Sequence, residues 1–244
     1  MKKILITGSS SGIGLEIAKK LNKDGNKIII NSRDKKKLKF LKKKHKFFNY
    51  SCGDMSLEDS AKKVVNESIK KLNGLDILIC NVGESKSCKP NKENYCEWKK
   101  MFNQNFFSAT NAIEAAKKNL IKSKGQIICI TSAAGVKFLE GAPITYSTSK
   151  SALNFYIKNI SFYLGKLNVR VNAIAPGNII FKNSTWEKKL KKNKKVIKEN
   201  LKRTVPLNKF GTTENIVNLV GFLISDNNHY FNGAIINLDG GLTI

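Results

Sequence analysis

Residues 3–14 read Lys3-Ile4-Leu5-Ile6-Thr7-Gly8-Ser9-Ser10-Ser11-Gly12-Ile13-Gly14, an apolar run that ends in a glycine-rich turn. Apolar residues then recur every four positions at Ile13, Ile17 and Leu21, which is the spacing of one helix face. A glycine-rich turn between a strand and a helix lets the backbone approach a pyrophosphate, and the helix N-terminus directs free N–H groups toward it. The stretch therefore predicts a strand–turn–helix unit that binds a dinucleotide.

Five further apolar runs of strand length follow along the chain, and segments with helical periodicity separate them. This alternation predicts an α/β protein with a doubly wound parallel sheet that helices cover on both faces. No linker, internal repeat or low-complexity block interrupts the pattern, so we expect one domain over residues 1–244. The six expected strands are Lys3–Thr7, Lys27–Asn31, Asp76–Cys80, Gln126–Thr131, Arg170–Ala175 and Ala234–Leu238.

The composition excludes several classes of protein. Of the 244 residues, 41% are apolar and 25% are charged, which is ordinary for a soluble folded chain and excludes collagen-like and disordered proteins. Lysine and arginine number 44 against 18 acidic residues, a net charge of +26 that is typical of nucleic-acid binding. Only Arg33, Arg170 and Arg203 are arginines, however, and arginine is the residue preferred for phosphate and base contacts. We therefore expect no nucleic-acid partner.

Membrane, metal and disulfide features are also missing from the sequence. No apolar run approaches the roughly 20 residues that span a bilayer, and the apolar start is too short for the core of a signal peptide. We therefore expect a cytoplasmic protein without a membrane partner. The five cysteines form no Cys-x-x-Cys pair, and His45 and His229 are the only histidines, so we expect neither a metal site nor disulfides.

The end of the second expected strand, Asn31-Ser32-Arg33, bears on which dinucleotide binds. An acidic side chain here would accept hydrogen bonds from the adenosine ribose and repel a 2′-phosphate. Ser32 is small and neutral, and the guanidinium of Arg33 suits a phosphate. These residues favour NADP(H) over NAD(H). Further on, Asp54 would either face the adenine or cap its own loop.

Tyr146 and Lys150 are four residues apart, so a helix would place them on one face. An ammonium beside a phenol favours the phenolate and would bring the pKa of Tyr146 from about 10 toward neutrality, which suits proton transfer. Ser132 precedes them at the end of another expected strand, the edge of a parallel sheet where ligands bind.

In combination, these motifs closely resemble the short-chain dehydrogenase/reductase family, and most of all its 3-oxoacyl-(acyl-carrier-protein) reductase branch. The resemblance implies a Rossmann fold with about seven strands. It also implies a homotetramer built by helices around residues 98–118 and 146–164 and by the C-terminal strand. The matching segments are Thr7–Gly14, Asn81-Val82-Gly83, Asn105, Ser132, Tyr146, Lys150, Ala175-Pro176-Gly177, Val205–Gly211, Phe222–Ser225 and Asp239-Gly240-Gly241.

The resemblance implies that a ketone is reduced to a secondary alcohol, or the reverse, with a hydride carried by the nicotinamide. Ser132 would polarise the substrate oxygen, Tyr146 would exchange a proton with it, and Lys150 would bind the nicotinamide ribose. Asn105 would help to hold a water in a proton relay behind Lys150. The residues implied to contact the cofactor are Gly8, Ser10, Ser11, Gly12, Ile13, Gly14, Ser32, Arg33, Asp54, Met55, Asn81, Gly83, Tyr146, Lys150, Pro176, Gly177 and Ile179.

The sequence departs from the family pattern at three points. Cys80 replaces the first asparagine of the usual Asn-Asn-Ala-Gly, and Phe181 occupies the place of a threonine after Pro176-Gly177. A second basic residue, which many NADP-dependent members carry inside the glycine-rich turn, is absent.

The segment after Pro176-Gly177 is implied to form a substrate lid over residues about 182–205. From Trp186 to Arg203, nine basic and two acidic residues accompany an apolar stripe, which predicts one amphipathic helix with a positive outer face. A capping box at Ser184 and Glu187 would start this helix, and Pro206 would follow its end. The stripe would either close over the substrate or pack on the core.

Three functions remain open. The first is NADPH-dependent reduction of a 3-oxoacyl thioester, carried by an acidic protein or by CoA. The second is the same chemistry on a keto-sugar or polyol in surface-polysaccharide synthesis, which would use the positive lid for a nucleotide-linked substrate. The third is a non-catalytic cofactor-sensing or nucleic-acid-binding regulator, which the intact Ser132, Tyr146 and Lys150 disfavour.

Overall fold

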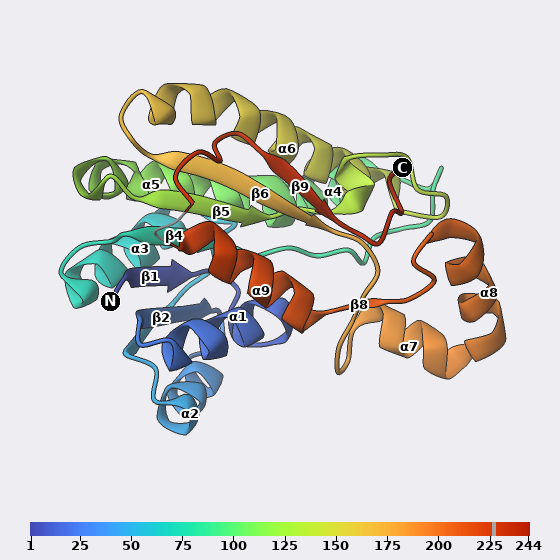
Figure 1. Cartoon of the computed structure of the whole chain (residues 1–244), viewed down its shortest axis with the longest axis horizontal. Helices are drawn as coiled ribbons and strands as arrows, with labels where there is room; N and C mark the ends of the chain where they lie inside the picture. Colours follow the sequence, from blue (N-terminus) through green and yellow to red (C-terminus); the bar gives the residue numbers. More distant parts are fainter. Residues whose placement is uncertain (226–227) are drawn as a thin grey trace.

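A computed structural model describes residues 1–225 and 228–244 of the chain. Seven parallel strands form one sheet in the order β3-β2-β1-β4-β5-β6-β9 (Figure 1). The expected doubly wound parallel sheet is therefore confirmed. The strands are β1 Lys3–Ile6, β2 Lys27–Ser32, β3 Asn49–Cys52, β4 Ile77–Cys80, β5 Gln126–Ile130, β6 Arg170–Pro176 and β9 Ile235–Leu238, and a separate parallel pair joins β7 Ile179–Ile180 to β8 Gly211–Thr212.

Helices cover both faces of the sheet (Figure 1). Buried side chains of α1, α2 and α9 share one apolar cluster with the sheet, and those of α3, α5 and α6 share the other. The helices are α1 Gly12–Lys23, α2 Lys35–His45, α3 Glu58–Leu72, α4 Tyr95–Phe102, α5 Ser108–Ser123, α6 Ile144–Gly165, α7 Thr185–Lys192, α8 Lys194–Thr204 and α9 Thr213–Ile224, with a π-helical turn η1 Asn103–Phe107 and a 3-10 turn η2 Ala133–Gly135.

The inner strands are largely apolar because they contribute to both clusters in alternation. In β1, Ile4 and Ile6 pack on the side of α1, whereas Leu5 packs on the side of α3 and α5. Successive side chains of a strand point to opposite faces, so a strand covered on both faces is apolar at most positions. This is why apolar runs alone could locate six strands.

The sequence pattern missed the edge strand β3. Its residues, Asn49–Cys52, are mostly polar and pair only with β2, and only Ser51 among them is fully buried. An edge strand with polar residues has no apolar run to reveal it.

The expected single helix over Trp186–Arg203 is wrong, because the segment contains two helices, α7 and α8. Asn193 separates them with an extended φ of −153°, and its side-chain oxygen accepts a hydrogen bond from the N–H of Val196, which caps α8. An asparagine cap satisfies the first N–H groups of a new helix and so competes with continuation of the old one. Both helices lie beyond the carboxyl ends of the strands (Figure 1).

The expected start of this segment is partly confirmed. Ser184 caps α7 through its hydroxyl, which accepts a hydrogen bond from the N–H of Glu187 at 3.1 Å. The Glu187 carboxylate bonds the N–H of Asn183 rather than that of Ser184, so the reciprocal half of the capping box is displaced by one residue. α8 ends at Thr204, before Pro206, as expected.

No helix in the described ranges is long and apolar enough to cross a membrane. The same ranges contain no group of three or more histidine, cysteine or acidic residues arranged to hold a metal ion.

Candidate active site

The glycine-rich turn joins β1 to α1 at the carboxyl edge of the sheet. Gly8 and Gly12 have positive φ angles of 61° and 56°, which side chains strongly disfavour. α1 begins at Gly12, and the Ser11 side chain does not cap it. Within the part of the chain that the structure describes, no protein acceptor pairs with the N–H groups of Gly12, Ile13 and Gly14, so these donors are available to an anion.

Asn81 holds this turn open. Its Nδ2 donates to the carbonyl of Gly8 at 3.0 Å, and its backbone N–H donates to Thr7 Oγ1 at 3.0 Å. A Cβ on Gly14 would lie only 2.4 Å from Asn81 Nδ2, so any side chain there would displace the asparagine. The turn therefore forms a cradle that suits a pyrophosphate, because its glycines carry no side chains and its N–H groups are unpaired.

Asn31 is a supporting residue that the sequence analysis missed. Its Oδ1 accepts from the N–H of Gly8 at 3.2 Å, and its Nδ2 donates to the carbonyls of Ser51 and Gly53. It thereby ties the turn to the loop after β3, where Asp54 lies. Asn31 is fully buried. Its role depends on contacts between segments that are distant in the sequence, so the sequence alone does not indicate it.

At the end of β2, Arg33 and Asp54 lie side by side. Arg33 Nη1 is 3.5 Å from Asp54 Oδ2, and the Arg33 side chain is 71% exposed. Burial raises the pKa of Asp54, but hydrogen bonds from Ser56 and the charge of Arg33 together lower it by more. The pKa of Asp54 therefore lies below its ordinary value. The carboxylate therefore stays ionised and shares the guanidinium with any phosphate that binds here.

Met55 and Ile179, which are expected cofactor residues, have apolar side chains that are buried. Met55 is 1% exposed and Ile179 is 6% exposed, and both pack in the apolar clusters. Only their backbones could face a nucleotide. Between them in the chain, Gly177 fits tightly, because a Cβ there would lie 2.7 Å from Asp239 Cβ.

Ser132, Tyr146 and Lys150 converge beside the cradle. Ser132 follows β5 and interacts through its hydroxyl with that of Tyr146, which lies in the first turn of α6. One turn later, Lys150 is buried and donates from Nζ to the carbonyl of Ile130 at 3.0 Å. A Cβ on Gly83 would lie 3.2 Å from Lys150 Nζ, so a glycine at this position lets the ammonium lie close to the backbone that follows β4.

The π-helical turn η1 presents Asn105 to the same space. Its Oδ1 accepts from the N–H of Glu84 at 2.9 Å, and its Nδ2 donates to the carbonyls of Glu84 and Met101. The side chain, 0% exposed, thus fixes the backbone after Gly83. Both amide hydrogens of Asn105 are used, so a water in a relay behind Lys150 would bond either the backbone or the second lone pair of Oδ1.

The electrostatics differ from the expectation for Tyr146. Burial raises the pKa of Tyr146, hydrogen bonding to Ser132 opposes this, and the Glu84 carboxylate raises it again. The predicted lowering of this pKa by Lys150 is therefore wrong for this structure, since the ammonium is directed at Ile130. Burial also lowers the pKa of Lys150 to about 8.

The departure at Cys80 has a structural explanation. Cys80 on β4 lies in register with Cys129 on β5, and both are buried. Hydrogen bonding to Cys129, together with burial, raises the pKa of the Cys80 thiol well above its ordinary value. The thiol is therefore an uncharged core group rather than a reactive one.

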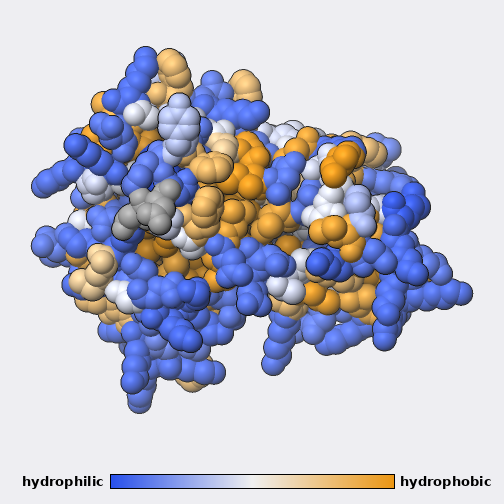
Figure 2. Space-filling model, viewed as in Figure 1, coloured by the Kyte–Doolittle hydropathy of each residue, from blue (hydrophilic) through white to orange (hydrophobic). Residues whose placement is uncertain are grey.

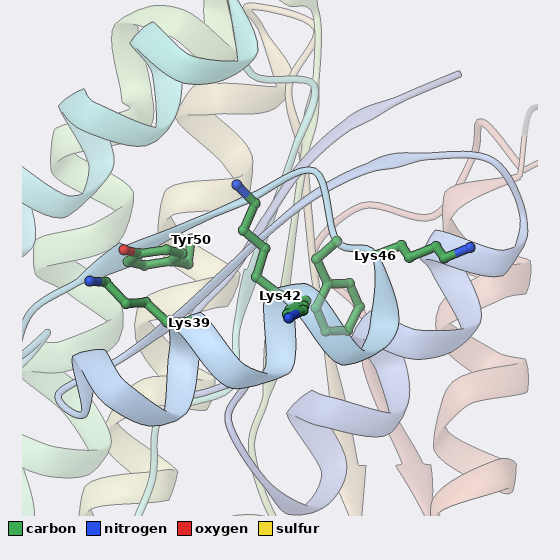
Figure 3. A pocket seen from close by; sticks show the side chains of 6 residues that line it. Lys39, Lys42, Lys46 and Tyr50 are labelled. Atoms are coloured by element: carbon green, nitrogen blue, oxygen red, sulfur yellow. The ribbon is translucent and has the colours of Figure 1, made fainter.

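A groove of about 580 Å³ lies away from this cluster, between α2 and β3 at the edge of the sheet. Figure 3 shows the side chains of Lys39 and Lys42 on the same side as the ring of Tyr50, whereas Lys46 extends away from it. Lysines and two aromatic residues make up the whole lining, so we assign the chemistry to the Ser132–Tyr146–Lys150 cluster.

Comparison with known proteins identifies the family. Residues 8–243 match a family model described as "Enoyl-(Acyl carrier protein) reductase". The chain belongs to the short-chain dehydrogenase/reductase family. Members of this family are oxidoreductases that bind nicotinamide cofactors.

Individual relatives are similar over nearly the whole chain. The chain is 34% identical to the 3-oxoacyl-[acyl-carrier-protein] reductase FabG of Rickettsia typhi, over 99% of this chain and 96% of that protein. It is 30% identical to the FabG of Aquifex aeolicus, over 98% and 96%. Among solved structures, L-sorbose reductase from Gluconobacter frateurii, complexed with NADPH and L-sorbose, is 27% identical with a TM-score of 0.90, over 99% and 96%.

Proposed function

We propose that the protein reduces a ketone to a secondary alcohol with NADPH, and that its substrate is a 3-oxoacyl thioester. The observation that carries this proposal is the meeting of Ser132, Tyr146 and Lys150 next to the glycine-rich cradle at one edge of the sheet. The FabG relatives, which match over the full chain, support the substrate class.

In the proposed reaction, the Ser132 hydroxyl donates a hydrogen bond to the ketone oxygen, and Tyr146 transfers its proton to that oxygen. When bound, the nicotinamide supplies the hydride. The raised pKa keeps the Tyr146 hydroxyl protonated at neutral pH, so the proton is present, but it also makes this phenol a weaker acid than one with a pKa near neutrality. Lys150, with a pKa of about 8 and one helical turn further along α6, would return the proton.

The cradle fits the diphosphate, with Gly12, Ile13 and Gly14 as donors. Arg33 would hold the 2′-phosphate of the adenosine ribose, which is the basis for proposing NADPH over NADH. The NADPH named in the description of the L-sorbose reductase structure supports this preference.

A second candidate is reduction of a keto-sugar or polyol. It is favoured by the structural similarity to L-sorbose reductase.

An NADPH-oxidation screen that compares acetoacetyl thioesters with keto-sugars separates the two candidates. We expect activity on the thioesters and its loss in Tyr146→Phe; full activity in that variant would refute the catalytic assignment. Steep salt-dependent binding to random DNA without any oxidation of NADPH would instead favour the regulator.

The segment formed by α7 and α8 would cover the substrate. Its one fully buried apolar residue is Leu201, whereas Trp186, Leu190 and Ile197 are partly exposed, so most of the stripe is free to face a ligand.

We further propose a cytoplasmic homotetramer. Phe155 and Phe162 on α6 are 69% and 59% exposed, and apolar side chains gather over β9 and its surroundings on the face shown in Figure 2.

A further inference from the structure

The residue that replaces the family's threonine, Phe181, touches the glycine-rich turn. A Cβ on Gly12 would lie 3.0 Å from Cε2 and 3.2 Å from Cζ of the Phe181 ring, so the ring edge is in van der Waals contact with this glycine. Phe181 is half-buried and packs against the apolar cluster on the α1 side of the sheet, as Ile13 does. An aromatic ring therefore lies on the turn at the first residue of α1.

This contact coincides with the place where a diphosphate would bind. The N–H groups of Gly12, Ile13 and Gly14 are the unpaired donors of the cradle. A diphosphate that accepts from these donors must approach within about 3 Å of the same backbone. The ring and the diphosphate thus compete for the surface around Gly12, and a phenyl ring offers the anion no hydrogen bond in return.

Phe181 is also tied to the start of α7. Its N–H donates to Ser184 Oγ at 3.2 Å, and its carbonyl accepts from the N–H of Ser184 at 2.9 Å. The Ser184 hydroxyl in turn caps α7. Two residues further on, the ring of Trp186 packs on Phe210 with centroids 5.7 Å apart. A shift of the Phe181 backbone must therefore be transmitted to the first turn of α7.

We propose that Phe181 is a positioning residue that couples the dinucleotide site to α7 and α8. The ring holds the segment against the glycine-rich turn, and entry of the diphosphate displaces the ring and moves the segment with it. This proposal rests on the dinucleotide binding proposed above and adds to it a defined competitor. It predicts that removing the ring strengthens dinucleotide binding and releases α7.

The test uses Trp186 as a reporter for α7. The chain has two tryptophans, so Trp98→Phe leaves Trp186 as the single emitter. In this background, Phe181→Ala removes the ring, Phe181→Leu keeps apolar bulk, and Phe40→Ala removes a 62% exposed ring on α2 as the control. Calorimetry with NADP⁺ gives the Kd, and Trp186 emission is recorded with and without NADP⁺.

We expect NADP⁺ to shift the Trp186 emission of the parent protein. In Phe181→Ala the emission should already be shifted without NADP⁺. The Kd for NADP⁺ should fall about 5-fold, because the diphosphate no longer has to displace a half-buried aromatic ring from the turn. Phe181→Leu should lie between the two, and Phe40→Ala should match the parent.

Two outcomes would overturn the proposal, and they separate it from the proposed function. If the parent binds NADP⁺ but Phe181→Ala and Phe181→Leu leave both the Kd and the emission unchanged, or weaken binding, the coupling is wrong while the proposed function stands. If the parent protein binds neither NADP⁺ nor NADPH by calorimetry, the proposed function fails and the coupling fails with it.

Discussion

Substitution of Arg33 should change which dinucleotide the protein binds. The Arg33 guanidinium stands at the end of β2, 71% exposed and 3.5 Å from the Asp54 carboxylate. A charge-assisted hydrogen bond contributes about 1.5–3 kcal/mol when formed, and the low end applies here because solvent screens an exposed side chain. Arg33→Gln should therefore weaken NADPH binding about 10-fold.

Arg33→Asp should have a larger effect, because it places a second carboxylate beside Asp54. Two unit charges about 4 Å apart in water repel by about 1 kcal/mol, so the 2′-phosphate would meet an additional penalty of that order. We expect NADPH to bind roughly 50- to 100-fold more weakly than to the wild type. NADH has no 2′-phosphate, and its Kd should change less than about 3-fold.

Calorimetric titrations of both dinucleotides with the wild type and the two variants measure these changes. Repeating the NADPH titration at high salt provides the control, since screening should reduce the difference between the wild type and Arg33→Gln. If all three proteins bind NADPH with the same Kd, or if NADPH and NADH weaken in parallel, Arg33 does not recognise the phosphate.

Three further predictions concern stability and pH. Gly14→Ala should lower the unfolding free energy by about 1–3 kcal/mol, because its Cβ would lie 2.4 Å from Asn81 Nδ2 and break the hydrogen bond from Asn81 to Gly8. Gly221→Ala in α9 is the contrast, since its Cβ meets nothing within 4 Å, and it should raise the unfolding free energy by about 0.5–1 kcal/mol. Equal denaturation midpoints for the two variants would contradict this. Burial lowers the pKa of Lys150 from 10.5 to about 8, so the unfolded chain binds more protons between these values. The unfolding free energy should then rise with pH across that window in the wild type but not in inactive Lys150→Met, as urea titrations at pH 7 and 9.5 would reveal. Lys124 ends α5 with a left-handed φ of 50°, so Lys124→Gly should raise the thermal midpoint by relieving about 0.5–1 kcal/mol, and a lowered midpoint would count against this reading.

The sequence was sufficient to predict those parts of the fold that depend on local pattern. Six strands were located because parallel strands buried on both faces are apolar at nearly every position, as β1 and β5 are after their first residue. β3 was missed because an edge strand with polar residues lacks that signature. The break at Asn193 was missed because helical periodicity continues through it, while the choice between capping and continuing depends on one side-chain hydrogen bond.

The candidate site shows the same division. Spacing brought Tyr146 and Lys150 onto one face of α6, and the structure places Ser132 beside them. The direction of the Lys150 ammonium and the burial of Tyr146 depend on neighbours from other elements, so the sign of the Tyr146 pKa shift could not be predicted from spacing. Asn31 supports the turn through contacts between strands that are distant in sequence, and no motif marks it.

The two edges of the sheet differ in a way that bears on self-association. β3 is only four residues long and is bordered by Lys46 and by Lys71, which donates to the carbonyl of Tyr50. A strand from another molecule that approached this edge would have to bring its own backbone past these two lysine side chains, which discourages strand addition. The opposite edge, β9, has no such barrier. Edge-to-edge extension of the sheet from one molecule to the next is thus blocked on one side of every molecule, which favours a finite assembly over a fibre.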